Sequence, residues 1–376
     1  MIEIQKPRTR IHSLDALRAI MMLLGVVLHS TEIYLVQRND PWPKDPNSTS
    51  LFLDYLEYFI HLFRMPIFFI MAGFFGALLF YERGSKKMLS NRVSRILYPF
   101  VVFLLILFPI VYFLLIYVRE IFSGNQNAFL ETYNGFTAYL PEFTIHLWFL
   151  YYLLLITLFS FGIAILIKNS FKLKTWVHKI FNKLFQNDYL KVINLSVFIF
   201  IALVIIWELS PPTPLGWIPE IDSFLFYLVF YLFGWLIYTS KYKLKKFTKN
   251  AWLYCIVAVY LFCLQIILEE NLSDIIKGII NAFTIALLIY GITGIFVNYF
   301  SDKSKSLKYI SDGSYWVYLI HLPFTILIPG LLAGFHLSAI VKFIITLILT
   351  SLVCFSSYHF LVRKTFIGKF LNGKKY

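Results

Sequence analysis

The chain has 376 residues, of which 59% are hydrophobic and only 14% are charged, and its mean hydropathy is +0.72. A soluble domain is about half apolar and a quarter charged, so this composition excludes an ordinary soluble protein and indicates several membrane crossings. The formal net charge of +14 does not require a nucleic-acid partner, because lysine and arginine collect in the cytoplasmic loops of membrane proteins. The three cysteines lie in apolar runs without ligand spacing, so we expect no disulfide framework and no metal site.

The first apolar segment, roughly 13–36, contains ionisable residues, which are costly inside a membrane and usually mark a functional site. Arg18 and His29 are separated by about three helical turns, so they share one face roughly 16 Å apart. Glu32 follows His29 by one turn, within reach of its imidazole. We interpret this face as a reaction path. The alternative is a buried pair that only fixes helix packing.

The second apolar segment, roughly 51–81, carries a polar stripe. Asp54, Glu57, His61 and Arg64 recur at i, i+3, i+7 and i+10, and lipid cannot accept such a helical face. Helix rise puts His61 about 15 Å and His29 about 10 Å from the outer ends of their spans. The two histidines are therefore expected to meet in the outer half of the bilayer. Mutual neutralisation of the charged residues in the stripe is the alternative interpretation.

Two arginines precede the third apolar segment. Arg92 and Arg95 stand at i and i+3, where they form a fork suited to phosphate groups, and Lys86 lies just upstream. The alternative is the ordinary excess of basic residues beside the cytoplasmic end of a span.

The hydropathy pattern predicts an all-α membrane protein, with a bundle of about ten transmembrane helices in one domain, 1–376. The expected spans are roughly 13–36, 51–81, 96–118, 143–167, 191–209, 221–239, 251–268, 274–299, 311–335 and 337–361. The N-terminus, with Lys6, Arg8 and Arg10, and the even-numbered connections are basic, which predicts that both termini are cytoplasmic. We also expect an interfacial amphipathic helix within 168–191.

Five motifs, in order over residues 8–323, carry a family resemblance. They are Leu14-Asp15-Ala16-Leu17-Arg18 followed after ten residues by His29, the run from Arg64-Met65-Pro66 to Gly73-Phe74, Arg92-x-x-Arg95, His146-Leu147-Trp148-Phe149-Leu150, and Tyr315-Trp316-Val317-Tyr318-Leu319-Ile320-His321. Together they resemble the acyltransferase-3 family of integral membrane proteins. The stretch from Leu28-His29 through His61-Leu62-Phe63-Arg64-Met65 is most similar to the branch that succinylates periplasmic glucans.

The resemblance implies a multi-pass protein of the bacterial inner membrane that acts as an O-acyltransferase. Such a protein moves an acyl group, acetyl or succinyl, from cytoplasmic acyl-CoA to a hydroxyl of an extracytoplasmic carbohydrate or glycan. It implies His29 as the catalytic histidine, and Arg92 and Arg95 as contacts of the CoA phosphates. We expect no separate extracytoplasmic domain.

The chemistry of acyl transfer gives the candidate residues their roles. Imidazole is the side chain best suited to take a hydroxyl proton near neutral pH, and a neighbouring carboxylate can orient it. A guanidinium or an indole N–H can stabilise an oxyanion. We therefore assign His29, Glu32, His61 and Arg64 to catalysis, Arg18, Lys86, Arg92 and Arg95 to donor binding, and Asp54, Glu57, His146, Trp148 and His321 to substrate binding. For His146 and His321 a structural hydrogen bond is the alternative.

Two other classes of protein stay open at this point. A proton-coupled secondary transporter also buries His, Glu and Arg, but usually shows two related halves, and the pattern of 13–100 does not recur in 190–376. A non-catalytic membrane protein that binds glycan or lipid would not need a base together with a phosphate clamp. The sequence leaves open the acyl group, the acceptor, direct transfer against an acyl-histidine, and whether the protein forms a homodimer.

Overall fold

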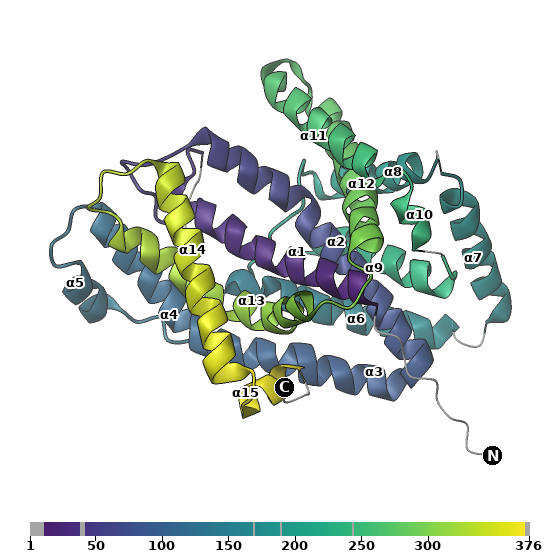
Figure 1. Cartoon of the computed structure of the whole chain (residues 1–376), viewed down its shortest axis with the longest axis horizontal. Coiled ribbons are helices and arrows are strands. Elements are labelled where there is room, and N and C mark those ends of the chain that lie inside the picture. The colour runs from purple at the N-terminus through teal and green to yellow at the C-terminus, as the bar shows by residue number, and fades with distance from the viewer. Residues whose placement is uncertain (1–10, 38–41, 168–169, 189, 243, 373–376) are drawn as a thin grey trace.

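The computed structural model describes residues 11–37, 42–167, 170–188, 190–242 and 244–372, and its elements are helices joined by loops (Figure 1). The basic residues Lys6, Arg8 and Arg10, on which part of the topology prediction depends, lie outside the described residues.

The elements follow one another in this order: α1 His12–Thr31, η1 Glu32–Tyr34, α2 Leu51–Arg83, α3 Ser85–Arg92, η2 Val93–Leu97, α4 Tyr98–Phe122, α5 Ala128–Gly135, η3 Ile145–Leu147, α6 Trp148–Ile167, α7 Phe171–Phe185, α8 Leu190–Ile206, α9 Ile221–Thr239, α10 Lys245–Thr248, α11 Ala251–Ile267, η4 Glu269–Asn271, α12 Asp274–Tyr299, α13 Lys305–Leu331, α14 Ala339–Ser357, η5 Tyr358–Val362 and α15 Phe366–Asn372. Of the η elements, η2 and η5 are π-helical turns.

Each of the ten expected spans contains one main helix, which confirms the all-α membrane fold. By length and composition, eight helical segments among the described residues can cross a membrane, or nine if α7 and α8 form one bent span. The short members, α8 and α11, have 17 residues each, about 26 Å of helix, the lower limit for a hydrocarbon core. Helix α8 stops early because Trp207 adopts a left-handed conformation (φ 53°) and prolines follow at 211 and 212.

Helix α2 is the centre of the bundle, since 83% of the residues in its most apolar 18-residue stretch are buried inside the protein. It continues through Pro66 as a single helix and crosses α9 at glycines of both helices. A Cβ on Gly73 would collide with the Tyr231 carbonyl, and a Cβ on Gly234 would collide with the Ile70 carbonyl. Small residues of this kind let two membrane helices approach closely, so α9 packs directly against the backbone of α2 at this crossing.

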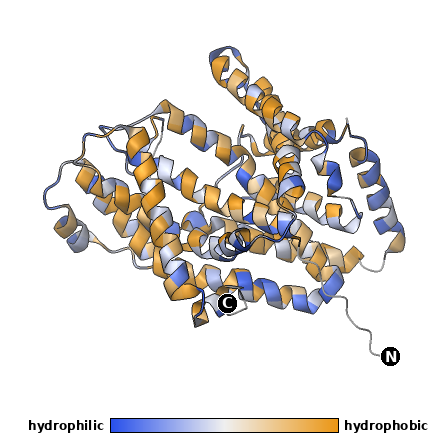
Figure 2. Ribbon diagram, in the orientation of Figure 1, coloured by the Kyte–Doolittle hydropathy of each residue, from blue (hydrophilic) through white to orange (hydrophobic). Residues whose placement is uncertain are grey.

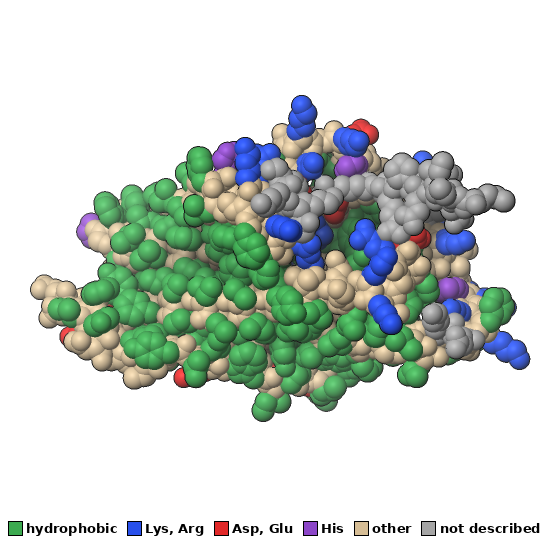
Figure 3. Space-filling view, turned by 90° about the horizontal axis from the view of Figure 1, so that it is seen from below, with side chains coloured by type: hydrophobic (Ala, Val, Ile, Leu, Met, Phe, Trp, Pro, Cys, Tyr) green, Lys and Arg blue, Asp and Glu red, His purple; other side chains and the backbone are tan. Residues whose placement is uncertain are grey.

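Helices α1 and α13 pack side by side, with α4 and α14 against α13 (Figure 1). The outer helices are mostly hydrophobic, whereas polar residues concentrate on α3, α7 and the loops (Figure 2). The space-filling view shows one broad apolar face, with lysine and arginine gathered toward one end of the molecule (Figure 3). This distribution is what a bundle embedded in lipid needs, because its lipid-facing surface must be apolar.

The segment expected to hold an amphipathic helix forms α7. Phe181 and Phe185 of this helix are buried against the bundle, while Trp176 is 60% exposed among lysines. Lys168, at the start of that segment, lies outside the described residues.

Candidate active site

The C-terminal end of α1 brings His29 and Glu32 together. The helix tightens there, since the Ser30 and Thr31 hydroxyls donate hydrogen bonds to the carbonyls of Val26 and Leu28, and the chain continues as the short helix η1. The His29 Nδ1 lies 3.3 Å from Glu32 Oε1, and the carboxylate side chain is only 4% exposed. Glu32 can therefore hold the ring by its Nδ1, which leaves Nε2 as the basic nitrogen.

Three other rings surround the His29 imidazole. The His321 centroid lies 5.3 Å away and the His146 centroid 6.3 Å away, and these two rings are 5.1 Å apart. Trp42, from the loop after η1, stacks on His29 at 5.9 Å with an interplanar angle of 17°. His146 reaches the site because Ile145 adopts a positive φ of 46° at the start of η3. Three histidines from distant parts of the chain thus form one cluster.

Backbone carbonyls fix the tautomers of His146 and His321. His146 Nε2 lies 3.2 Å and 3.1 Å from the carbonyl oxygens of Tyr318 and Leu319, so this nitrogen carries a proton and donates it. His321 Nδ1 donates to the carbonyls of Val317 and Tyr318 at 3.1 Å and 2.7 Å. Among the described residues, His146 Nδ1 and His321 Nε2 are buried without a hydrogen-bond partner. Both are therefore bare acceptor nitrogens.

Arg64 of α2 lies beside this cluster, 9% exposed. It occupies space that Gly25 of α1 leaves open, since a Cβ on Gly25 would lie 2.5 Å from Arg64 Nη1 and 4.0 Å from His321 Nε2. The Arg64 Nε is buried and has no hydrogen-bond partner in the described part of the chain. A buried guanidinium with hydrogen-bonding capacity to spare is suited to stabilising a developing negative charge.

His61 and His29 line the same cavity of about 130 Å³, which we call the reaction cavity. The two histidines, which were expected to meet, therefore face one space, and His61 Nε2 also lies 2.6 Å from the Pro211 carbonyl oxygen. That bond holds the α8–α9 connection over the cavity. The rings of His146, His321 and Trp42 also lie around His29. Glu57, Arg64 and Trp148 also line the reaction cavity.

A narrow space leads away from the reaction cavity toward the start of α1. This neck measures about 20 Å³ and shares His29, Arg64, His146 and Trp148 with the reaction cavity. At its other end it shares Met22, Phe68 and Phe149 with a third cavity of about 390 Å³, which we call the Arg92 mouth. The three spaces form one row through the bundle.

Three arginines line the Arg92 mouth. Arg92 donates to the Ala72 carbonyl at 3.4 Å, Arg95 donates to the Phe370 carbonyl at 3.2 Å, and Arg18 Nη2 lies 3.6 Å from Asp15. Arg95 lies on the π-helical turn η2, a local irregularity that is frequent at functional sites. Lys86, in contrast, is exposed and does not line this cavity.

Asp54 and Glu57 occupy different positions on α2. The Asp54 carboxylate accepts hydrogen bonds from the backbone N–H groups of Val36 (2.9 Å) and Gln37 (3.0 Å), so it fixes the chain that follows η1. Glu57 lines both the reaction cavity and a larger neighbouring cavity.

Sequence reasoning missed Trp42 and Gly25. Trp42 belongs to a polar loop without periodicity, so no local pattern could place it on His29. Gly25 offers a weak signal, since a glycine on the same helix as Arg18 and His29 can mark a close approach.

Comparison with known proteins agrees with this architecture. Residues 11–359 match the acyltransferase domain of the acyltransferase-3 family. Similar relatives named glucans biosynthesis protein C come from Escherichia coli (strain K12), Escherichia coli O139:H28 (strain E24377A / ETEC) and Shigella dysenteriae serotype 1 (strain Sd197). Each is 26% identical to this chain over 85% of its length and 83% of the relative's length, and no solved structure matches. Because the matched domain covers most of the chain, the protein belongs to the acyltransferase-3 family and is a membrane acyltransferase.

Proposed function

We propose that the protein transfers an acyl group from acyl-CoA to a hydroxyl group of a carbohydrate, and that the reaction takes place in the reaction cavity. One observation carries this proposal: the Arg92 mouth, the neck and the reaction cavity follow one another with shared lining residues, with arginines at one end and the His29–Glu32 pair at the other. Acyl-CoA has its phosphates at one end and its thioester at the end of a long arm. Guanidinium groups suit the phosphates. The neck has room for about one water molecule in this structure, so the side chains that line it must move apart to admit the arm.

The reaction needs a base, an oxyanion partner and an acid in turn. His29 Nε2 takes the proton of the acceptor hydroxyl while its oxygen attacks the thioester carbonyl carbon. Arg64 stabilises the negative oxygen of the tetrahedral intermediate. The C–S bond then breaks, and the His29 imidazolium returns the proton to the thiolate, so that an ester and free CoA result. A route in which His29 Nε2 first accepts the acyl group uses the same residues.

The acceptor and the orientation in the membrane are part of the proposal. The relatives' name points to glucans as the acceptor class. The excess of basic residues on the even-numbered connections supports a cytoplasmic Arg92 mouth and an extracytoplasmic reaction cavity in a bacterial plasma membrane.

Purified protein in lipid nanodiscs tests the proposal directly. It is incubated with acetyl-CoA or succinyl-CoA and a neutral glucan oligosaccharide, and mass spectrometry follows the acylated sugar while a thiol reagent follows free CoA. We expect ester product from one of the donors and none from the His29→Ala variant. Absence of both thioester cleavage and ester product, together with proton flux in liposomes, would favour a transporter and overturn the proposal.

A further inference from the structure

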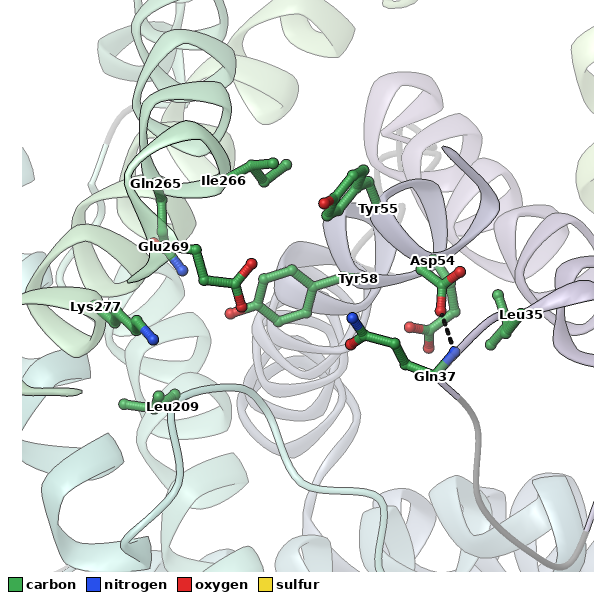
Figure 4. A pocket seen from close by; sticks show the side chains of 11 residues that line it. Leu35, Gln37, Asp54, Tyr55, Tyr58, Leu209, Gln265, Ile266, Glu269 and Lys277 are labelled. Atoms are coloured by element: carbon green, nitrogen blue, oxygen red, sulfur yellow. Dashed lines mark hydrogen bonds between the residues drawn. The ribbon is translucent and has the colours of Figure 1, made fainter. Parts of the chain in front are cut away.

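A second large cavity opens between α2 and the α11–α12 pair. This α2–α11 cavity measures about 520 Å³ and is lined by Leu35, Gln37, Asp54, Tyr55, Glu57, Tyr58, Leu209, Gln265, Ile266, Glu269 and Lys277. Its volume falls within the range of about 300–1,000 Å³ that is typical of small-molecule sites. Figure 4 shows the Tyr58 ring in the middle of the lining, with Gln37 and Asp54 on one side and Gln265, Glu269 and Lys277 on the other.

We propose that the α2–α11 cavity binds a neutral oligosaccharide and presents one of its hydroxyl groups to His29. The proposal rests on the function proposed above and assigns the acceptor to a separate subsite. The connection between the two sites is Glu57, which lines both the α2–α11 cavity and the reaction cavity. A sugar chain in the larger cavity therefore lies next to the cavity that holds the catalytic base, with the Glu57 side chain between the two.

A buried amide points to a polar ligand in this cavity. Gln265 is 6% exposed and its side chain lies within hydrogen-bonding reach of the Tyr58 hydroxyl, yet its Oε1 has no hydrogen-bond partner among the described residues. Gln265 stands in the helix α11, which is otherwise almost wholly apolar. Leaving a buried acceptor unsatisfied costs stability, so its place in the lining is explained by a ligand that donates a hydrogen bond, as a sugar hydroxyl does.

The lining is also held in place for binding. Asn281 is fully buried and its Nδ2 donates to the Tyr58 hydroxyl and to the Leu209 carbonyl, both at 2.7 Å. Tyr58 is thereby fixed at the centre of the cavity by a residue of α12. A preorganised aromatic ring offers an apolar face to the C–H groups of a sugar without an entropic cost at the time of binding.

The charge of the cavity selects among ligands. Asp54, Glu57 and Glu269 contribute three carboxylates, against one ammonium from Lys277, so the balance of three negative and one positive charges is −2. Such a lining repels phosphates and carboxylates, and the CoA polyanion is therefore expected at the Arg92 mouth instead. Carboxylates and amide oxygens accept hydrogen bonds from neutral sugar hydroxyls. A glycan that already bears an anionic group is expected to bind poorly.

Three variants with a matched control test this assignment. Gln265→Leu removes the unsatisfied amide and suits an apolar helix, Glu269→Gln removes one charge, and Glu269→Lys changes the net charge of the cavity from −2 to 0. Glu270→Gln is the control, because Glu270 is the exposed neighbour of Glu269 and does not line the cavity. The measurements are oligosaccharide affinity by calorimetry in nanodiscs, KM for the oligosaccharide, and acyl-CoA affinity.

We expect Gln265→Leu and Glu269→Gln to raise both the Kd and the KM for a neutral glucan oligosaccharide by roughly tenfold, the usual effect of losing one strong hydrogen bond. Acyl-CoA affinity and the properties of Glu270→Gln should stay those of the wild type. Glu269→Lys should reduce the preference for the neutral oligosaccharide over a carboxymethylated one. Unchanged oligosaccharide affinity in all three variants, or tight binding of a divalent cation that excludes the sugar, would overturn the assignment.

The experiment separates this inference from the proposed function. If oligosaccharide binding depends on Gln265 and Glu269 but no acyl transfer occurs, the proposed function is wrong and the oligosaccharide site is supported. If acyl transfer occurs and its KM for the oligosaccharide is the same in all three variants as in the wild type, the proposed function is supported and the oligosaccharide site is wrong.

Discussion

His146 and His321 share one hydrogen-bond acceptor, the backbone carbonyl of Tyr318, which lies 3.2 Å from His146 Nε2 and 2.7 Å from His321 Nδ1. A carbonyl oxygen has two lone pairs and can accept both protons. One peptide unit of α13 thereby fixes two imidazoles in opposite tautomers. Their other nitrogens become acceptors beside His29, which suits them to accept hydrogen bonds from neighbouring hydroxyl groups of the acceptor while His29 removes the proton of the reacting hydroxyl.

Replacing His29 should remove the chemistry and spare donor binding. We expect His29→Ala to lower kcat by about 10²–10⁴-fold, the usual effect of losing a general base. Acyl-CoA affinity should be kept, because the arginines of the Arg92 mouth are untouched. Steady-state kinetics and equilibrium binding of a labelled acyl-CoA in nanodiscs measure the two quantities.

His61→Ala is the comparison for this experiment. Its imidazole is engaged with the Pro211 carbonyl, so its loss should loosen the α8–α9 connection and lower activity less than His29→Ala. A folded His29→Ala protein with near-normal turnover would rule out His29 as the base.

Gly25→Ala should displace the Arg64 guanidinium without unfolding the protein. The added Cβ would lie 2.5 Å from Arg64 Nη1, which is the far end of a flexible side chain and can move. Loss of one oxyanion donor costs about 10²–10³-fold in kcat, and a displaced donor should cost at least tenfold. The control is Gly162→Ala on α6, where nothing lies within 4 Å of the new Cβ. Equal turnover of the two variants would separate Arg64 from catalysis.

The fold was largely predictable because membrane helices are encoded locally. A run of about 20 apolar residues has few other stable states in lipid, so every expected span contains a helix. The ends were harder to predict: the span expected to reach residue 209 ends at Ile206, since the left-handed Trp207 stops the helix.

The site was predictable only where its residues are neighbours on one helix. His29 and Glu32 are one turn apart on α1, so their spacing alone predicts that they are close. The cluster of His29, His146 and His321 depends on how α1, η3 and α13 pack, and no spacing within one segment encodes that. His61 illustrates the same limit, because helix spacing predicts its depth in the membrane but not its contact with the Pro211 carbonyl, which the α8–α9 connection brings to it.

The orientation in the membrane is open to chemical labelling. We expect residues 119–142 and 269–273 to be extracytoplasmic and residues 82–95 to be cytoplasmic, from the distribution of lysine and arginine. The three native cysteines are first replaced by serine or alanine, and single cysteines are then introduced into each connection. A membrane-impermeant maleimide added to intact cells should label the first two groups. Labelling within 82–95 from outside would reverse the orientation.

The arginines of the Arg92 mouth should determine donor affinity. Arg92→Ala or Arg95→Ala removes a charge-assisted hydrogen bond, typically about 1.5–3 kcal/mol, so acyl-CoA affinity should fall at least tenfold. Arg→Lys variants should recover only part of the loss, because an ammonium lacks the planar fork. Lys86→Ala is the control, since Lys86 is exposed outside the cavity. If the arginine variants bind acyl-CoA as tightly as Lys86→Ala does, Arg92 and Arg95 do not bind the donor and serve only to orient the chain in the membrane.

Lys342 and Asp45 form the buried ion pair that anchors the loop beside the site. Their atoms Nζ and Oδ2 are 2.7 Å apart, with side chains 0% and 1% exposed. The Asp45 backbone N–H also donates to the Ile33 carbonyl, so this pair ties the loop that bears Trp42 to both η1 and α14. Lys342→Met should leave an uncompensated buried carboxylate and destabilise the protein by about 3–5 kcal/mol.

The double variant Asp45→Asn/Lys342→Met distinguishes the pair from its surroundings. Replacing both partners removes the unpaired charge, so most of the lost stability should return. The midpoint of unfolding in detergent measures stability. Because the chain has eight tryptophans, the difference in fluorescence between each variant and the same variant with Trp42→Phe reports whether the loop still stacks on His29. If the double variant regains stability but not turnover, the ion pair positions Trp42 for catalysis. A double variant no more stable than Lys342→Met would show that the loop is held by other contacts.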